Sequence, residues 1–313
     1  MQAQASKAAV HDLEYVPSAG ATSGLLWWGE FVPDQRETDS YSLVYDTEPL
    51  GEEIEILGLP HAILHVSATA PLANWFVRLS DVAPDGSVTL ITGAALSGAQ
   101  RESASNPKEL EPGKVYELDI ELHFTSWVFQ KGHRIRVAIS NAVWPMVWPT
   151  PYSMTTSLYL GGETPSRLLL PVLPCEKRPR PHFRAPEYIE VPGLELERKT
   201  ERRPEWMVHR HPHGGTTSVV YHILGTLSLP FGRRVFSETY TYKIDDAHPE
   251  AASLLAEEFE IWELEDRVLT FKAILDLSGD KENMYYNLKR ELYKEGKLIR
   301  EKTFKEAIRR DHQ

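Results

Sequence analysis

Residues Leu122 to Leu160 read LHFTSWVFQKGHRIRVAISNAVWPMVWPTPYSMTTSLYL, and this stretch decides the fold. A run of alternating side chains leads into the turn dipeptide Lys131-Gly132, which is followed by a second alternating run and a loop rich in Trp and Pro. Alternation with a period of two residues is typical of strands that bury one face. The stretch therefore predicts two strands joined by a turn, followed by a rigid aromatic loop.

The same alternation extends beyond this stretch. From Tyr116 to Phe124 the apolar side chains point one way and the charged or polar ones the other, and Arg134 to Ile139 repeats the pattern. Upstream, Trp75 to Ser80 alternates and ends near Pro84-Asp85-Gly86, a triplet suited to a hairpin turn. Many short strands without helical periods indicate an all-β antiparallel sandwich rather than a βαβ sheet.

Composition and turn residues divide the chain into four parts. We expect an N-terminal arm at residues 1–39, a sandwich at 40–174, a Pro-rich strap at 175–205, and a β-rich extension at 206–313 that packs on the sandwich. In the extension, Met284 to Phe304 predicts a hairpin with its turn at Lys294-Glu295-Gly296-Lys297. The segment Asp245 to Leu255 is compatible with one short helix after Pro249.

Charge and cysteine content restrict the partners and the compartment. The net charge of −11 argues against a general nucleic-acid or anionic-membrane binder, since both roles normally need a basic face. The single cysteine, Cys175, excludes an internal disulfide and is consistent with a reducing compartment. The N-terminal residues show no apolar core of signal-peptide length. We expect a cytoplasmic protein with neither a nucleic-acid nor a membrane partner.

A serine nucleophile on an elbow needs the sequence G-x-S-x-G, in which a strained turn lifts the serine hydroxyl toward a histidine. The chain contains no such pentapeptide. Gly20-Ala21-Thr22-Ser23-Gly24 and Ser97-Gly98 come nearest, but their glycines stand at the wrong offsets. We therefore do not expect a self-contained Ser-His-Asp hydrolase, and we assign no catalytic residue.

Histidines and aspartates offer two candidate metal sites. The HRHPH sequence at residues 209–213 would align three imidazoles on one face of a strand. Pro212 interrupts such a strand, which favours a solvated loop. Asp81, Asp85 and Asp119 lack the D-x-D-x-D-G spacing of a calcium loop, and turn and edge positions account for them. We assign no metal and no cofactor.

Two Trp-Pro pairs, Trp144-Pro145 and Trp148-Pro149, predict a rigid aromatic loop. Trp rings stack on sugars and on cations, so one interpretation is a carbohydrate site. The other interpretation is that the rings close the open end of the sandwich.

Four motifs, in this order, resemble the C-terminal β-domain of X-Pro dipeptidyl-peptidases and cocaine-esterase-like (CocE/NonD) hydrolases. They are Asp34-Gln35-Arg36 with Ile54 to Gly58, RLSDVAPDG from Arg78 to Gly86, LEPGKVY from Leu110 to Tyr116, and FQKGHRIR from Phe129 to Arg136. Residues after about Arg203 are similar to a further β extension in some members. The resemblance implies a galactose-binding-like jelly roll, which in relatives packs against an α/β-hydrolase domain carrying serine, aspartate and histidine.

The resemblance also implies roles for particular residues. His133 belongs to a structural G-H-R motif, and we expect it to form a hydrogen bond with a neighbouring loop. No catalytic residue of the family matches a position in this chain. In relatives, the stretch before the jelly roll runs near the mouth of the hydrolase site. The residues that we place next to a substrate or partner on this basis, or as members of the aromatic loop, are Leu25, Leu26, Trp27, Trp28, Trp144 and Trp148.

Two functions of different classes follow. The first is a non-catalytic β-domain of a serine hydrolase of the X-Pro dipeptidyl-peptidase or CocE type, an accessory or split half that acts with a separately encoded α/β-hydrolase domain in ester or peptide hydrolysis. The second is a free-standing jelly-roll module that binds a glycan or a small ligand. A homo-oligomer is compatible with both.

Overall fold

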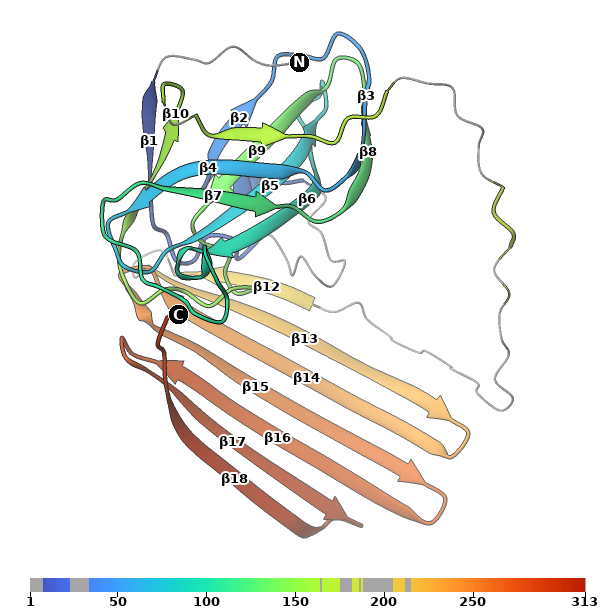
Figure 1. Ribbon diagram of the computed structural model, residues 1–313. Coiled ribbons are helices and arrows are strands. Elements are labelled where there is room, and N and C mark those ends of the chain that lie inside the picture. The colour runs from blue at the N-terminus through green and yellow to red at the C-terminus, as the bar shows by residue number, and fades with distance from the viewer. Residues whose placement is uncertain are drawn as a thin grey trace. The chain divides into compact units, whose positions relative to one another are not determined.

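Figure 1 shows the computed structural model, which describes residues 8–22, 34–163, 165–174, 182–185, 187, 205–211 and 215–312. The chain forms two compact units. The first comprises Met1–Cys175, Asp245–Glu250 and Asp311–Gln313, and the second comprises Glu176–Ile244 and Ala251–Arg310. Antiparallel strands dominate both, which confirms the all-β prediction. Within the described residues, no helix has the length and apolarity to span a membrane.

The first unit consists of two larger sheets and a strand pair (Figure 1). One sheet contains β1 (Ala9–Glu14), β4 (His61–Ala68), β7 (Tyr116–Glu121), β10 (Thr155–Leu160) and β11 (Arg167–Leu169). The other has the order β2 (Leu43–Asp46), β9 (Arg134–Ser140), β5 (Asn74–Val82) and β6 (Val88–Ser97). The pair is β3 (Ile54–Gly58) with β8 (Thr125–Phe129), and α1 (Arg36–Asp39) precedes β2.

Alternate residues of the two larger sheets meet in one apolar core. Leu64 of β4 and Leu118 of β7 belong to the same cluster of buried side chains as Trp75 of β5 and Ile139 of β9. Since side chains from both sheets share this cluster, the sheets pack face to face as a sandwich. The jelly-roll order of the strands stays a prediction.

The N-terminal residues contain more regular structure than the arm that the sequence predicts. Ala9–Glu14 pair with β10 along their whole length, from Ala9 opposite Leu160 to Glu14 opposite Thr155. Tyr15, Ala19 and Ala21 are buried. Backbone pairing at a sheet edge requires little side-chain periodicity, so the polar sequence AVHDLE forms a strand that alternation alone does not reveal.

The second unit is one antiparallel sheet in which neighbours in sequence are neighbours in space. Its strands are β12 (Glu205–Arg210), β13 (Thr216–Leu229), β14 (Gly232–Asp245), β15 (His248–Leu264), β16 (Arg267–Gly279), β17 (Asn283–Lys294) and β18 (Lys297–Arg309). Whether this sheet packs on the sandwich stays a prediction.

The structure contradicts the short helix at Asp245 to Leu255. β14 ends at Asp245, whose carboxylate accepts a hydrogen bond from the Ala247 amide at 2.9 Å, and β15 begins at His248. The Ala- and Leu-rich sequence favours a helix locally, but pairing of β15 with β16 over twelve residue pairs overrides this preference. The predicted hairpin at residues 284–304 is confirmed, since Lys294 pairs with Lys297.

The turn of this hairpin supports a prediction about stability. Glu295 and Gly296 have φ angles of 47° and 74°, so both lie in the left-handed region. A Cβ atom at Gly296 would meet nothing within 4 Å, which leaves backbone strain as the only cost of a side chain. Gly296→Val should lower the free energy of unfolding by about 1–2 kcal/mol in urea denaturation. Gly51→Val, at another glycine with open space but no positive φ, should cause a clearly smaller change; equal losses would contradict the assignment to backbone strain.

Candidate functional site

The outer face of the four-stranded sheet, on the side away from the core, is itself covered. β5 contributes Phe76, Arg78 and Ser80 to this face, and each is at most 3% exposed. α1 lies over one part, where the backbone N–H of Gln35, the residue before the helix, donates to the Val88 carbonyl at 2.9 Å. The loop after β9 lies over another part through the buried Val143. We call this region the covered face.

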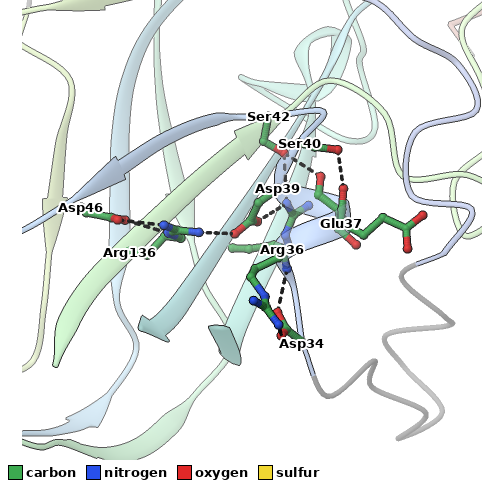
Figure 2. Close-up of polar contacts among 10 residues, drawn as sticks. Asp34, Arg36, Glu37, Asp39, Ser40, Ser42, Asp46 and Arg136 are labelled. Carbon is green, nitrogen blue, oxygen red and sulfur yellow. Dashed lines mark hydrogen bonds and ion pairs between the residues drawn. The ribbon is translucent and has the colours of Figure 1, made fainter. Parts of the chain in front are cut away.

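A charge network fixes α1 to the covered face (Figure 2). The Asp39 carboxylate lies between two guanidinium groups: Arg78 Nη2 is 2.8 Å from Oδ1, and Arg136 Nη1 is 3.1 Å from Oδ2. Arg136 also holds Asp46 in a bidentate pair at 2.7 and 2.8 Å. Arg78 donates to the Ser42 hydroxyl at 3.0 Å. Four elements are thereby tied together: α1 and its C-terminal turn, β2, β5 and β9.

The network is buried at one end and open at the other. The side chains of Arg78 and Asp39 are 3% and 4% exposed, whereas those of Arg136 and Asp46 are 17% and 28% exposed. Hydrogen bonds from Arg136 to Asp46, and then to Asp39, raise the pKa of the Arg136 guanidinium although its burial opposes this. A guanidinium does not give up its proton at physiological pH. The network can therefore position α1 but cannot act as an acid or base through its arginines.

Asp81, near the end of β5, forms a second polar centre. Its carboxylate accepts hydrogen bonds from the Trp127 indole at 3.0 Å and interacts with His133 Nδ1 at 2.8 Å. The Asp81 side chain is 6% exposed, so these contacts satisfy a buried acceptor. His133 thus has structural contacts, as predicted: its imidazole meets Asp81 on a strand, and its carbonyl accepts a hydrogen bond at 2.8 Å from the Leu50 amide, in the loop between β2 and β3.

An apolar cavity of about 290 Å³ opens beside the network on the covered face. Its walls include Phe76 from β5, Leu90 from β6, and Val143 and Met146 from the loop after β9. Phe124, which is 66% exposed, also lines it. Sites of this size and apolarity bind a single apolar side chain or a small ligand.

The structure places the Trp-Pro loop as part of the fold. Trp144 is 1% exposed and precedes a cis peptide bond to Pro145. Its ring meets that of Trp148 edge to face, with 5.5 Å between centroids. Both faces of the Trp144 ring are covered, so a sugar has no open ring there on which to stack.

The remaining predicted residues either lie outside the described residues or are exposed. Leu25, Leu26, Trp27 and Trp28 lie outside the described residues, as does His213. His209 and His211 are exposed. Across the part of the chain that the structure describes, no group of three or more His, Cys, Asp or Glu side chains is arranged to hold a metal ion.

Sequence reasoning missed the charge network, although signals for it exist. Arg78 and Asp81 are the only charged residues of the strand NWFVRLSDV, and a charge in a buried strand requires a partner. The partner Asp39 lies 39 residues away, and Arg136 lies 97 residues from Asp39. No local pattern specifies such pairings.

Comparison with known proteins shows which family the first unit matches. Residues 2–170 match the model of a family described as the X-Pro dipeptidyl-peptidase C-terminal non-catalytic domain. A cocaine esterase from Rhodococcus sp. (strain MB1 Bresler) is 33% identical over 175 residues, which cover 50% of this chain and 30% of the esterase.

Two solved structures align with part of the chain. An aminopeptidase from a marine sediment Thaumarchaeota archaeon aligns at 27% identity and a TM-score of 0.49, covering 55% of this chain and 34% of the other. An α-amino acid ester hydrolase aligns at 26% identity and a TM-score of 0.48, covering 54% and 33%. The chain thus spans about a third of the length of these relatives.

Proposed function

Because the chain belongs to the family of X-Pro dipeptidyl-peptidase C-terminal non-catalytic domains, we propose that it is the accessory β-domain of a serine hydrolase whose nucleophile lies on an α/β-hydrolase domain. The family match covers the sandwich, and the sequence contains no G-x-S-x-G. This combination carries the proposal. The reaction of the pair is hydrolysis of an ester or a peptide, the two classes that the names of the similar esterase and of the matched family indicate.

The layer over the covered face, namely α1 and the loop after β9, is the surface that this proposal assigns to the hydrolase domain. Its network fixes α1, which follows Leu25, Leu26, Trp27 and Trp28 in sequence, and these four residues are the proposed contacts with the hydrolase domain or its substrate. The apolar cavity and the exposed Phe124 would receive an apolar side chain from that domain. Trp144 and Trp148 contribute indirectly, because their loop supplies the Val143 and Met146 walls.

The jelly-roll topology and a cytoplasmic location are further parts of the proposal. The family match supports the first, and the lone Cys175 supports the second.

Affinity purification of the tagged full chain from its native host tests the proposal. We expect a co-eluting α/β-hydrolase domain, with esterase or X-Pro-peptidase activity that a serine-directed inhibitor abolishes. Joint replacement of Trp27 and Trp28 by alanine should reduce the recovered activity at least about tenfold, the loss typical of aromatic anchors at an interface. Val172→Ala, at a residue 56% exposed, serves as the control and should leave recovery unchanged.

Two results would count against the proposal. Inhibitor-sensitive hydrolysis by the purified chain alone would place the nucleophile here. Full recovery of a partner by the double Trp variant would remove residues 27 and 28 from the contact.

A further inference from the structure

The second unit carries an apolar surface that the family match does not reach. On β16, Leu269, Phe271, Ala273, Leu275 and Leu277 alternate and share one side of the sheet. We call this side the leucine face. The opposite side of β16 carries a mixture of polar and apolar residues, from Val268 to Ser278.

Strand register extends the leucine face onto β15 and β17, because directly paired residues share a side. Each row across the three strands has its centre on β16. The rows are Leu254–Leu277–Tyr286, Ala256–Leu275–Leu288, Glu258–Ala273–Arg290, Glu260–Phe271–Leu292 and Trp262–Leu269–Lys294. The face is therefore apolar along its middle and charged toward its sides.

The two sides carry opposite charge. On the β14–β15 side, Arg234 pairs with Glu260 and lies over the Trp262 ring, so β14 contributes to this face beside β15. Burial raises the pKa of Glu258, and the neighbouring charge of Glu238 adds to this shift. Three carboxylates thus face one guanidinium on this side.

The β17–β18 side is basic. Register places Arg290 opposite Lys302 and Leu292 opposite Arg300, all on the leucine face. The Arg290 guanidinium and the Lys302 ammonium lie 5.1 and 4.3 Å from the centroid of the Phe304 ring. With Lys294 and its partner Lys297, five cations stand on this side, against one carboxylate, that of Glu306 opposite Tyr286.

The described strands of the second unit form a single sheet, so they supply no second layer over the leucine face. A sheet with one apolar face is stabilised when that face packs against another layer. A hollow of about 460 Å³ lies on the face, lined by Phe271, Leu292 and Trp262 among others. The covering layer must therefore fit an apolar centre, an acidic side and a basic side.

We propose that the layer is the leucine face of a second copy of this chain. A twofold axis running along β16, midway between two sheets about 10 Å apart, places β15 of each copy over β17 of the other and keeps every row in register. Glu258 then meets Arg290 of the second copy, and the acidic side of each copy faces the basic side of the other. Aligned sheets cross at about −30°, so contacts are closest around the central row at Ala273.

The charge pattern favours this occupant over others. An isologous interface needs a surface that complements itself after a twofold rotation. The leucine face meets this condition in its rows, since the apolar row Ala256–Leu275–Leu288 meets its own copy and Lys294 approaches the Trp262 ring. A simple apolar ligand would not require opposite charges on the two sides.

Sedimentation velocity of the full chain tests the proposal. We expect a dimer at about 50 µM, where an interface of micromolar affinity is mostly occupied. Glu258→Arg and Arg290→Glu should each weaken dimerisation at least about tenfold, because each sets like charges against one another. The double variant Glu258→Arg/Arg290→Glu restores opposite charges across the axis and should return the affinity to within about threefold of the original.

The matched control lies one residue away on the other side of the sheet. Glu257 pairs with Ile274, which pairs with Lys289, so Glu257→Arg changes the same charge outside the leucine face. It should leave the dimer intact. Circular dichroism of each variant separates loss of the dimer from loss of folding.

Several outcomes would overturn the proposal. They are a monomeric wild-type chain at this concentration, a double variant that stays as weak as the folded single variants, or an equal effect of Glu257→Arg. A monomer that retains an apolar small molecule or a different protein on this face would also overturn it.

Discussion

Replacement of Asp39 by alanine should lower the free energy of unfolding of the full chain by about 3–5 kcal/mol, the cost of breaking a buried ion pair from one side. The variant leaves the Arg78 guanidinium, 3% exposed, without the carboxylate that neutralises it. Ser42 would remain as a neutral hydrogen-bond acceptor. Urea denaturation followed by tryptophan fluorescence measures the change.

Glu37→Ala provides the control in the same helix. Glu37 is exposed, so its removal should alter stability by less than about 0.5 kcal/mol. A loss below about 1 kcal/mol in Asp39→Ala would contradict this prediction. Buried ion pairs can add little net stability when both partners are replaced together, but Asp39→Ala removes only one of them. The loss of stability in Asp39→Asn should fall between those in Asp39→Ala and Glu37→Ala, because the amide oxygen still accepts one hydrogen bond.

This variant also links the fold to the proposed function. If the network holds α1 in place for a hydrolase domain, Asp39→Ala should weaken recovery of the partner more than Gly296→Val, which acts in the other unit. Equal losses in the two variants would indicate a general effect of lower stability.

Part of the sandwich could be predicted because several of its strands alternate between apolar and polar side chains. Ile135 and Ile139 are buried on β9 as their spacing predicts, and Gly132 has the positive φ of 85° that the Lys131-Gly132 turn requires. The alternating run from Tyr116 is correct only to Glu121, where β7 ends. Leu122 is still buried, but Phe124 is 66% exposed, because the chain leaves the sheet before β8 begins.

The candidate site could not be predicted to the same extent, for two physical reasons. Burial of both faces of β5 depends on α1 and on the loop after β9, which pack on it only in the folded chain. The partners of Arg78 and Asp81 are likewise distant in sequence, since His133 follows Asp81 by 52 residues. Alternation reports which side of a strand is apolar, but it does not report what lies on the other side.

Trp144→Ala should lower the free energy of unfolding by about 3–5 kcal/mol, as removal of a large buried ring does in other cores. Its surroundings hold it tightly: the Trp144 amide donates to the Ala19 carbonyl at 2.7 Å, and a Cβ atom on Gly20 would lie 2.7 Å from the Val143 Cα atom. Backbone that close has little room to collapse into the space left by the indole. Differential scanning calorimetry and urea denaturation both measure the loss.

Comparison with Trp148→Ala tests whether the Trp rings stabilise the fold or bind a sugar. Trp148 is only half-buried, so its loss should cost about 1–2 kcal/mol, clearly less than that of Trp144. A ring that binds a sugar by stacking shows the opposite behaviour, because its removal changes stability little and abolishes binding. If Trp144→Ala unfolds like the parent chain but no longer binds a glycan array that the parent binds, the ring serves recognition. If Trp144→Ala is strongly destabilised while Trp148→Ala is not, the aromatic loop closes the sandwich. The surface available to a partner is then the cavity wall formed by Val143 and Met146 rather than the indole rings.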